Sequence, residues 1–200
     1  MKERRKPKLN SGKSVVYALI AANILIFINL NFFPVTRDVF LLDHTNYLQK
    51  PWTLLSVFFS HENLLHLLAN MGLLFFFGRE LEKNIGGKKV LYVYFLAGLS
   101  GSLSIILYAD YIGWSGAVAG ASAAVFGVCA AYAILNPERM ILRGKAIHWL
   151  ISLFVVNLIL TILNPELSIG GPAHALGVII GVLFTMKIKK EKEQGTNKSK

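Results

Sequence analysis

Six apolar stretches constrain the fold of this 200-residue chain more than any other feature. A helix needs roughly 17–25 mostly apolar residues to cross a lipid bilayer. The stretches lie at Val15–Phe33, Glu62–Gly78, Val90–Tyr108, Gly116–Leu135, Ala146–Leu163 and Pro172–Ile188. Only 16% of the residues are charged, whereas soluble domains carry about 25%. The sequence therefore predicts an all-α polytopic membrane protein with six transmembrane helices.

The basic residues lie almost entirely on one side of this predicted membrane domain. Of the 21 lysines and arginines, all but Arg37 and Lys50 lie before the first stretch, between the second and third, between the fourth and fifth, or near the end of the sixth and beyond it. Cytoplasmic loops of membrane proteins are rich in Lys and Arg, so both chain ends are predicted to be cytoplasmic. We expect a basic tail at 1–14, one membrane domain at 15–188 and a second basic tail at 189–200.

The same distribution decides how the net charge of +10 is interpreted. Basic groups concentrated in tails and cytoplasmic loops favour contact with anionic lipid over nucleic acid. The chain has one cysteine, Cys129, which excludes an internal disulfide framework and a Cys-rich zinc site. We therefore expect a lipid bilayer as the environment, with no nucleic acid, no metal and no cofactor.

Four polar residues stand in the outer halves of three predicted spans: His66 and Asn70 in the second, Ser122 in the fourth and His174 in the sixth. At 1.5 Å per residue they lie roughly 3–12 Å below the outer ends of their helices. An ionisable group inside a membrane is a functional hypothesis by default. A serine, a histidine and hydrogen-bond donors are the components of a nucleophilic acyl-transfer site.

Small residues predict that the fourth and sixth spans pack closely, because such residues let helix backbones approach each other. They form one track at Gly116, Gly120 and Ala124 and another at Gly177 and Gly181, with Val178 as a candidate lipid-facing position. Close packing would bring His174 within reach of Ser122. No carboxylate falls in the central part of any span, so the predicted site is a Ser–His pair without an acidic third member.

These residues resemble the motifs of the rhomboid intramembrane serine proteases over about residues 15–186. His61-Glu-Asn-Leu-Leu-His66-Leu-Leu-Ala-Asn70 is similar to that family's HxxxxHxxxN motif on the second helix. Gly120-Ala-Ser122-Ala is similar to GxSx on the fourth helix. Ala173-His174-Ala-Leu-Gly177 is similar to AHxxG on the sixth.

The resemblance implies a role for each matching residue. Ser122 would be the nucleophile and His174 the general base, while His66, Asn70 and the Ser122 backbone N–H would form the oxyanion hole. The supporting residues would be His61, Phe126, Gly120 and Gly177, with Phe126 packed on the base. Two positions depart from the family's common pattern: Ala123 stands where many members have glycine, and Thr53 follows Trp52 where many have arginine.

The implied activity is cleavage of single-pass transmembrane proteins near the outer membrane face, by an enzyme of the cell membrane whose site opens to the outside. One alternative is a non-catalytic relative that binds transmembrane clients, which would be expected to lack Ser122 or His174. A metalloprotease would need histidines four residues apart, whereas His61 and His66 are five apart. A transporter would be expected to have midplane charges and internal repeats, and neither is evident.

Overall fold

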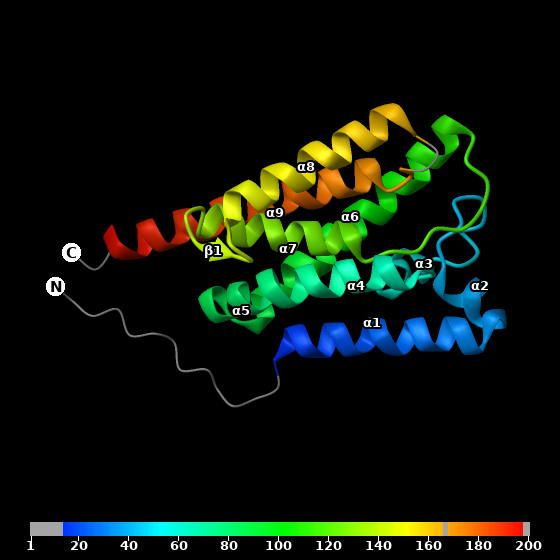
Figure 1. Cartoon of the computed structure of the whole chain (residues 1–200), viewed down its shortest axis with the longest axis horizontal. Helices are drawn as coiled ribbons and strands as arrows, with labels where there is room; N and C mark the ends of the chain where they lie inside the picture. The colour runs from blue at the N-terminus through cyan, green and yellow to red at the C-terminus, as the bar shows by residue number, and fades with distance from the viewer. Residues whose placement is uncertain (1–13, 166–167, 198–200) are drawn as a thin grey trace.

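The computed structural model describes residues 14–165 and 168–197 of the chain. Among these residues, five helical stretches are long and apolar enough to cross a membrane: Val15–Phe32, Leu64–Ile85, Gly87–Ile112, Ala146–Leu163 and Gly171–Glu191. A sixth apolar helix, α7 (Ser122–Leu135), is shorter. The predicted all-α architecture with six apolar helices is confirmed (Figure 1).

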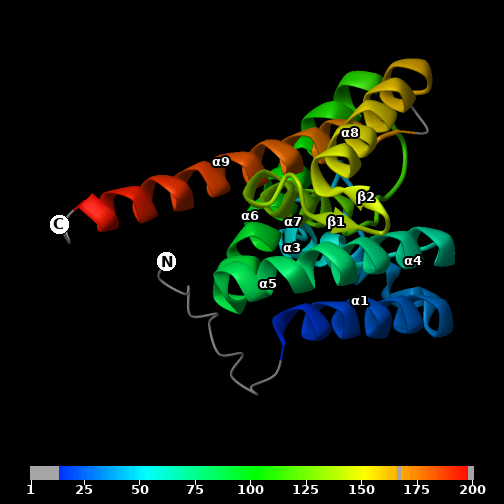
Figure 2. The same cartoon turned by 60° about the vertical axis from the view of Figure 1, so that its left-hand side comes forward.

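The first two spans lie side by side at one flank of the bundle (Figures 1 and 2). Helix α1 (Val15–Phe32) packs against a continuous helical rod made of α4 (Leu64–Leu73), the π-helical turn η3 (Leu74–Gly78) and α5 (Arg79–Ile85). The rod is longer than predicted. It ends at Gly86, whose φ of 85° breaks the helix, and α6 (Gly87–Ile112) begins at the next residue.

The segment between α1 and α4 forms short helical turns at one end of the bundle (Figure 1). These turns are η1 (Pro34–Thr36), α2 (Arg37–Phe40), α3 (Thr53–Ser56) and η2 (Val57–Phe59). Leu42 in this segment forms an isolated antiparallel bridge with Val118. That bridge ties the segment to the chain just before α7, which is where the polar residues of interest lie.

Helix α7 is the centre of the core, and every residue from Ala123 to Ala133 is buried. It packs against α6, α8 (Ala146–Leu163) and α9 (Gly171–Asn197). The contact with α9 depends on glycine, because a Cβ at Gly177 would lie 2.2 Å from the Ala123 carbonyl oxygen and one at Gly181 2.2 Å from that of Gly127. The predicted close approach of these two helices is present.

Two details of the predicted packing are wrong. The expected track at Gly116 and Gly120 precedes the helix, because α7 begins only at Ser122. Gly116 has a φ of 120°, a conformation that glycine tolerates and other residues resist, so the backbone there is not helical. Val178 is 9% exposed and belongs to the core; Ile179, which is 48% exposed, is the outward-facing neighbour.

A small antiparallel hairpin, β1 (Met140–Ile141) with β2 (Gly144–Lys145), connects α7 to α8 at the end of the bundle opposite the short turns (Figure 1). Its two turn residues, Leu142 and Arg143, have φ values of 47° and 65°. The Trp149 indole N–H donates to the Ile141 carbonyl at 2.8 Å. This hairpin was not among the predicted elements.

Candidate active site

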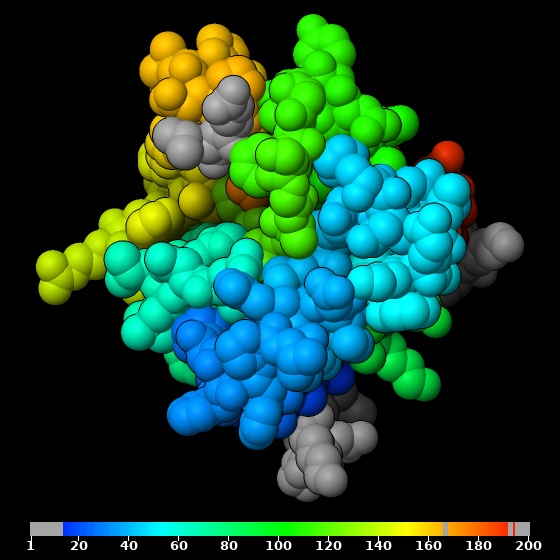
Figure 3. Space-filling view, turned by 90° about the vertical axis from the view of Figure 1, so that its right-hand side faces the viewer, coloured from blue at the N-terminus to red at the C-terminus, as the bar shows by residue number. Residues whose placement is uncertain are grey.

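The polar residues of the predicted site surround a cavity of about 400 Å³. Its walls come from η2, α4, α6, the segment before α7, the first turns of α7, one face of α8 and the start of α9. Figure 3 looks onto this end of the molecule, where the segment before α7 (green) crosses between the early turns (blue and cyan) and α8 with the start of α9 (yellow and orange). The cavity is therefore a meeting point of segments far apart in sequence.

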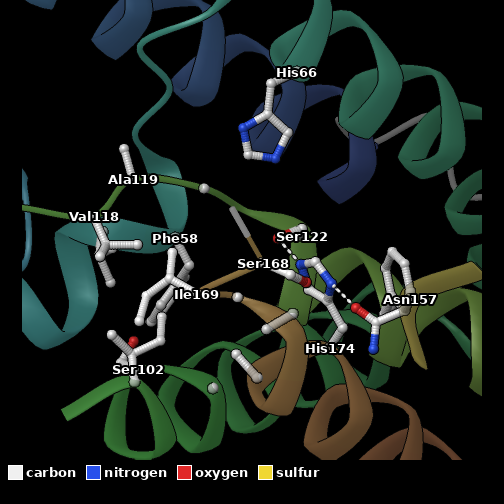
Figure 4. A pocket seen from close by; sticks show the side chains of 18 of the residues that line it. Phe58, His66, Ser102, Val118, Ala119, Ser122, Asn157, Ser168, Ile169 and His174 are labelled. Atoms are coloured by element: carbon white, nitrogen blue, oxygen red, sulfur yellow. Dashed lines mark hydrogen bonds between the residues drawn. The ribbon is translucent and has the colours of Figure 1, made fainter. Parts of the chain in front are cut away.

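Ser122 and His174 meet in this cavity. The Ser122 Oγ lies 2.6 Å from His174 Nε2 (Figure 4). Ser122 is the first residue of α7 and His174 lies in the first turn of α9. Because the two helices touch through Gly177 and the backbone of Ala123, their first turns lie close enough for the two side chains to hydrogen bond.

Ser122 stands at a helix start, whereas the predicted span began at Gly116 and placed it within a helix. The first N–H groups of an α-helix have no partner within the helix, and the N-cap residue of α7, Ala121, has no side-chain acceptor that could cap them. The partial positive charge of a helix N-terminus favours an anion placed against it. The Ser122 backbone N–H thus belongs to a group of donors suited to binding an oxyanion.

Gly120 keeps the space between His66 and Ser122 open. A Cβ at Gly120 would lie 2.9 Å from His66 Cε1 and 3.5 Å from Ser122 Oγ. The Gly120 N–H donates to the Val57 carbonyl at 3.1 Å, which fixes the segment before α7 against η2. A larger residue at this position would fill the volume beside the serine hydroxyl.

His66 and Asn70 are placed differently with respect to the cavity. The His66 ring lines it, opposite Ser122 and His174 (Figure 4). Asn70 is buried, and its side-chain amide donates to the His66 backbone carbonyl at 2.9 Å. Asn70 is not among the residues that line the cavity.

His61 is fully buried behind His66, with the centroids of the two rings 5.1 Å apart. Its Nε2 accepts a hydrogen bond from the Ala121 backbone N–H at 3.4 Å. Burial, with a smaller contribution from His66, lowers the pKa of His61 to about 3. The ring is therefore neutral at neutral pH, with Nε2 free to accept that bond just before the start of α7.

Two residues besides Ser122 contact the His174 ring, one at its face and one at its Nδ1 atom. The Phe126 ring stacks on it with a centroid distance of 4.7 Å and an interplanar angle of 20°, as predicted for an aromatic residue one turn after the serine. The Asn157 Oδ1 lies 2.6 Å from His174 Nδ1 (Figure 4). The sequence analysis missed Asn157, although an amide in the apolar run of Ala146–Leu163 was a signal that could have singled it out.

Comparison with known proteins identifies the family. The "Rhomboid domain" family model matches residues 48–191, well over half of the chain. "RHOMBOID-like protein 7" of Arabidopsis thaliana is 34% identical over 140 residues, which is 68% of this chain and 42% of that protein. The "Putative rhomboid protease YdcA" of Bacillus subtilis is 27% identical over 146 residues, 72% of this chain and 70% of that protein.

A third relative, "Inactive RHOMBOID-like protein 8" of Arabidopsis thaliana, is 37% identical over 57 residues, 28% of this chain and 16% of that protein. The alignment with RHOMBOID-like protein 7 spans less than half of that protein's length. The matched range nevertheless includes His61, His66, Ser122 and His174. With its six apolar helices, this chain is a multi-pass membrane protein that belongs to the rhomboid family.

Proposed function

We propose that this protein is an intramembrane serine endopeptidase in which Ser122 and His174 form the catalytic dyad. The observation that carries the proposal is the 2.6 Å contact between Ser122 Oγ and His174 Nε2 at the wall of a cavity. A hydroxyl is a weak nucleophile until a neighbouring base takes its proton. An imidazole within hydrogen-bond distance is the usual base for this purpose.

The reaction proceeds through an acyl-enzyme. The Ser122 Oγ attacks the carbonyl carbon of the scissile peptide bond while His174 Nε2 accepts the hydroxyl proton. The tetrahedral intermediate collapses when the C–N bond breaks, and the His174 imidazolium gives its proton to the leaving nitrogen. Water then attacks the ester with His174 again accepting a proton, and cleavage of the ester C–O bond returns the proton to Ser122.

The negative charge of the tetrahedral intermediate needs hydrogen-bond donors. We assign this role to the Ser122 backbone N–H at the start of α7 and to the His66 ring across the cavity. The Asn70 amide, which does not line the cavity, is the third proposed donor. Asn70 Nδ2 carries two protons, and the bond to the His66 carbonyl uses one of them. His61, Phe126, Gly120 and Gly177 support this geometry through the contacts described above.

Replacing His66 or Asn70 by alanine is expected to lower kcat by up to roughly 10²–10³-fold for each lost donor, with little change in KM. A donor to the oxyanion acts on the transition state and not on bound substrate, which is why the loss appears in kcat. Leu65→Ala is the matched control, because Leu65 is 75% exposed on the same helix. Variants of both residues that mainly raised KM would favour a role in helix packing alone.

The arrangement of charge supports a site that opens to the outer side of the membrane. The cavity lies at the end of the bundle that carries the short turns, since η2 lines it. The β1–β2 hairpin, which includes Arg143 and Lys145, lies at the opposite end (Figure 1). By the positive-inside rule the hairpin end is cytoplasmic. The membrane domain at 15–188 would then have both termini in the cytoplasm; residues 1–13 and 198–200 of the basic tails lie outside the described residues.

The proposed substrates are single-pass membrane proteins cut near the outer end of a transmembrane helix that can unwind. Polar groups at this depth are tolerated when they line a water-filled cavity, and such a cavity would supply the hydrolytic water. A competing role as a non-catalytic protein that binds transmembrane clients is raised by the relative whose name calls it inactive. The presence of both Ser122 and His174 favours the protease.

The test is a cleavage assay with the full-length protein in proteoliposomes and a model single-pass substrate. We expect the substrate to be cut, and mass spectrometry to place the cut near the outer end of its transmembrane helix. A substrate that binds the protein and stays intact over a range of pH, lipid composition and sequence would contradict the protease and support the client-binding role.

A further inference from the structure

Asn157 is the buried polar residue of α8 that faces the proposed base. Its side-chain Oδ1 lies 2.6 Å from His174 Nδ1, and its Nδ2 donates to the Gly171 backbone carbonyl at 3.0 Å. The residue is 8% exposed. Both bonds cross from α8 to the start of α9, so Asn157 joins the two helices beside His174.

The partners of Asn157 determine which way its amide points. A backbone carbonyl can only accept a hydrogen bond, so the atom facing Gly171 is the NH₂ nitrogen and the atom facing His174 is the oxygen. The His174 Nδ1 must then carry a proton to donate to that oxygen. In the neutral ring the other nitrogen, Nε2, is left as an acceptor, which is the form needed to take the Ser122 proton.

The backbone around Asn157 is itself held in place. The Thr161 hydroxyl, one turn later in α8, donates to the Asn157 backbone carbonyl at 2.8 Å and lies 3.1 Å from Ser168 Oγ. A Cβ on Gly171 would lie 2.0 Å from Thr161 Oγ1. The start of α9 therefore rests directly on α8, which fixes the distance between the Asn157 amide and the His174 ring.

An amide also suits this location better than a carboxylate would. A charged side chain inside a membrane is costly, whereas a neutral amide with both of its polar atoms hydrogen bonded is not left with an unpaired buried group. Asn157 can thus orient the histidine without placing a permanent negative charge within the bilayer.

We infer that Asn157 is a positioning residue of the proposed protease, which holds the Nδ1-protonated tautomer of His174 and aims its Nε2 at Ser122. This inference rests on the proposed function and adds a third member to the dyad. Asn157 acts through His174 and makes no contact of its own with the reacting bond.

Three variants of the full-length protein test the inference. Asn157→Leu keeps a similar size and removes both polar atoms. Asn157→Asp keeps an acceptor for His174 Nδ1. Leu158→Ala is the matched control, because Leu158 follows Asn157 on the same helix, is 47% exposed and does not line the cavity. The measured quantities are the rate at which a fluorophosphonate probe labels Ser122, as a function of pH, and the thermal stability in detergent.

We expect Asn157→Leu to label about 10–100-fold more slowly than the wild type, since small errors in the placement of a catalytic group have effects of this size. Asn157→Asp should recover much of the rate, and the acid limb of its pH–rate profile should move to higher pH because a carboxylate favours the protonated imidazole. His66, the other titratable group on the cavity wall near His174, is unchanged in all variants. Leu158→Ala should label at nearly the wild-type rate.

Two results would overturn the inference while leaving the proposed function standing. One is wild-type labelling in Asn157→Leu. The other is an equal loss of labelling rate in Asn157→Leu and Asn157→Asp that parallels a loss of thermal stability, with the pH profile of Asn157→Asp unchanged. That result would mean that Asn157 has a purely structural role. A wild-type protein that the probe does not label would instead overturn the proposed function, and the inference with it.

Discussion

Ser122→Ala and His174→Ala are each expected to abolish proteolysis, with losses of about 10³-fold or more. The physical reason is that the hydroxyl supplies the bond-forming atom and the imidazole removes its proton across the 2.6 Å contact. Members of one catalytic unit act together, so the double variant should be no slower than either single variant. The measurement is initial cleavage rates of a model transmembrane substrate in proteoliposomes.

Folding must be controlled in this experiment, because both residues lie at the starts of packed helices. Thermal unfolding in detergent should stay near the wild-type value for both alanine variants. Ser102→Ala is a suitable comparison: Ser102 lines the same cavity, but its hydroxyl donates to the Gly98 carbonyl. Full activity in either Ser122→Ala or His174→Ala would end the dyad hypothesis.

Gly177→Val is expected to reduce activity by about 10²-fold or more and to lower stability at the same time. Even a single Cβ at this position would lie 2.2 Å from the Ala123 carbonyl oxygen, so α7 and α9 must separate. A displacement of about 1 Å at a catalytic group can cost about 10²-fold in rate, and overpacking of a core costs about 1–3 kcal/mol. Cleavage rates and thermal unfolding of the same preparations measure the two effects.

Ile179→Val is the control for this change, since it introduces the same residue two positions later on α9, where the side chain is 48% exposed. It should leave activity and stability close to the wild type. A Gly177→Val protein with full activity and full stability would mean that the two helices do not meet at Gly177, and the placement of His174 beside Ser122 would have to be abandoned.

Much of the fold could be predicted because its main determinants are local in the sequence. Apolar runs of membrane length predicted the spans, and their boundaries were nearly right for α1 and α8. The meeting of Ser122 with His174 was also predictable, because Gly177 and Gly181 mark a helix face that a neighbouring backbone can touch. Topology then placed the two polar residues at the same depth.

The start of α7 was not predictable by the same reasoning, because residues 116–121 are as apolar and small as the helix that follows. Tertiary contacts hold these residues out of the helix: Val118 forms a β-bridge with Leu42, and the Gly120 N–H donates to the Val57 carbonyl. These partners lie more than 60 residues away in sequence. The consequence bears on the proposed site, since the first backbone N–H of α7 is that of Ser122.

Asn157 was missed for a different reason. A lone asparagine in an apolar helix has no local partner that reveals its role, and the sequence analysis looked for a carboxylate as the third member. Its meaning depends on a contact with His174, 17 residues away and on another helix. Val178 is a second example. It is buried while its neighbour Ile179 is 48% exposed, and the sequence alone does not show which of two adjacent apolar residues of α9 faces the core.

The most direct test of the central claim is to map the site that a fluorophosphonate modifies. Three serines line the cavity: Ser102, Ser122 and Ser168. Among the described residues, only the Ser122 hydroxyl is hydrogen bonded to a histidine ring nitrogen; the other two hydroxyls have different partners. We expect one phosphonyl adduct, on Ser122, that is lost in His174→Ala. An adduct on Ser102 or Ser168, or equal labelling of Ser122 in the His174→Ala protein, would contradict it.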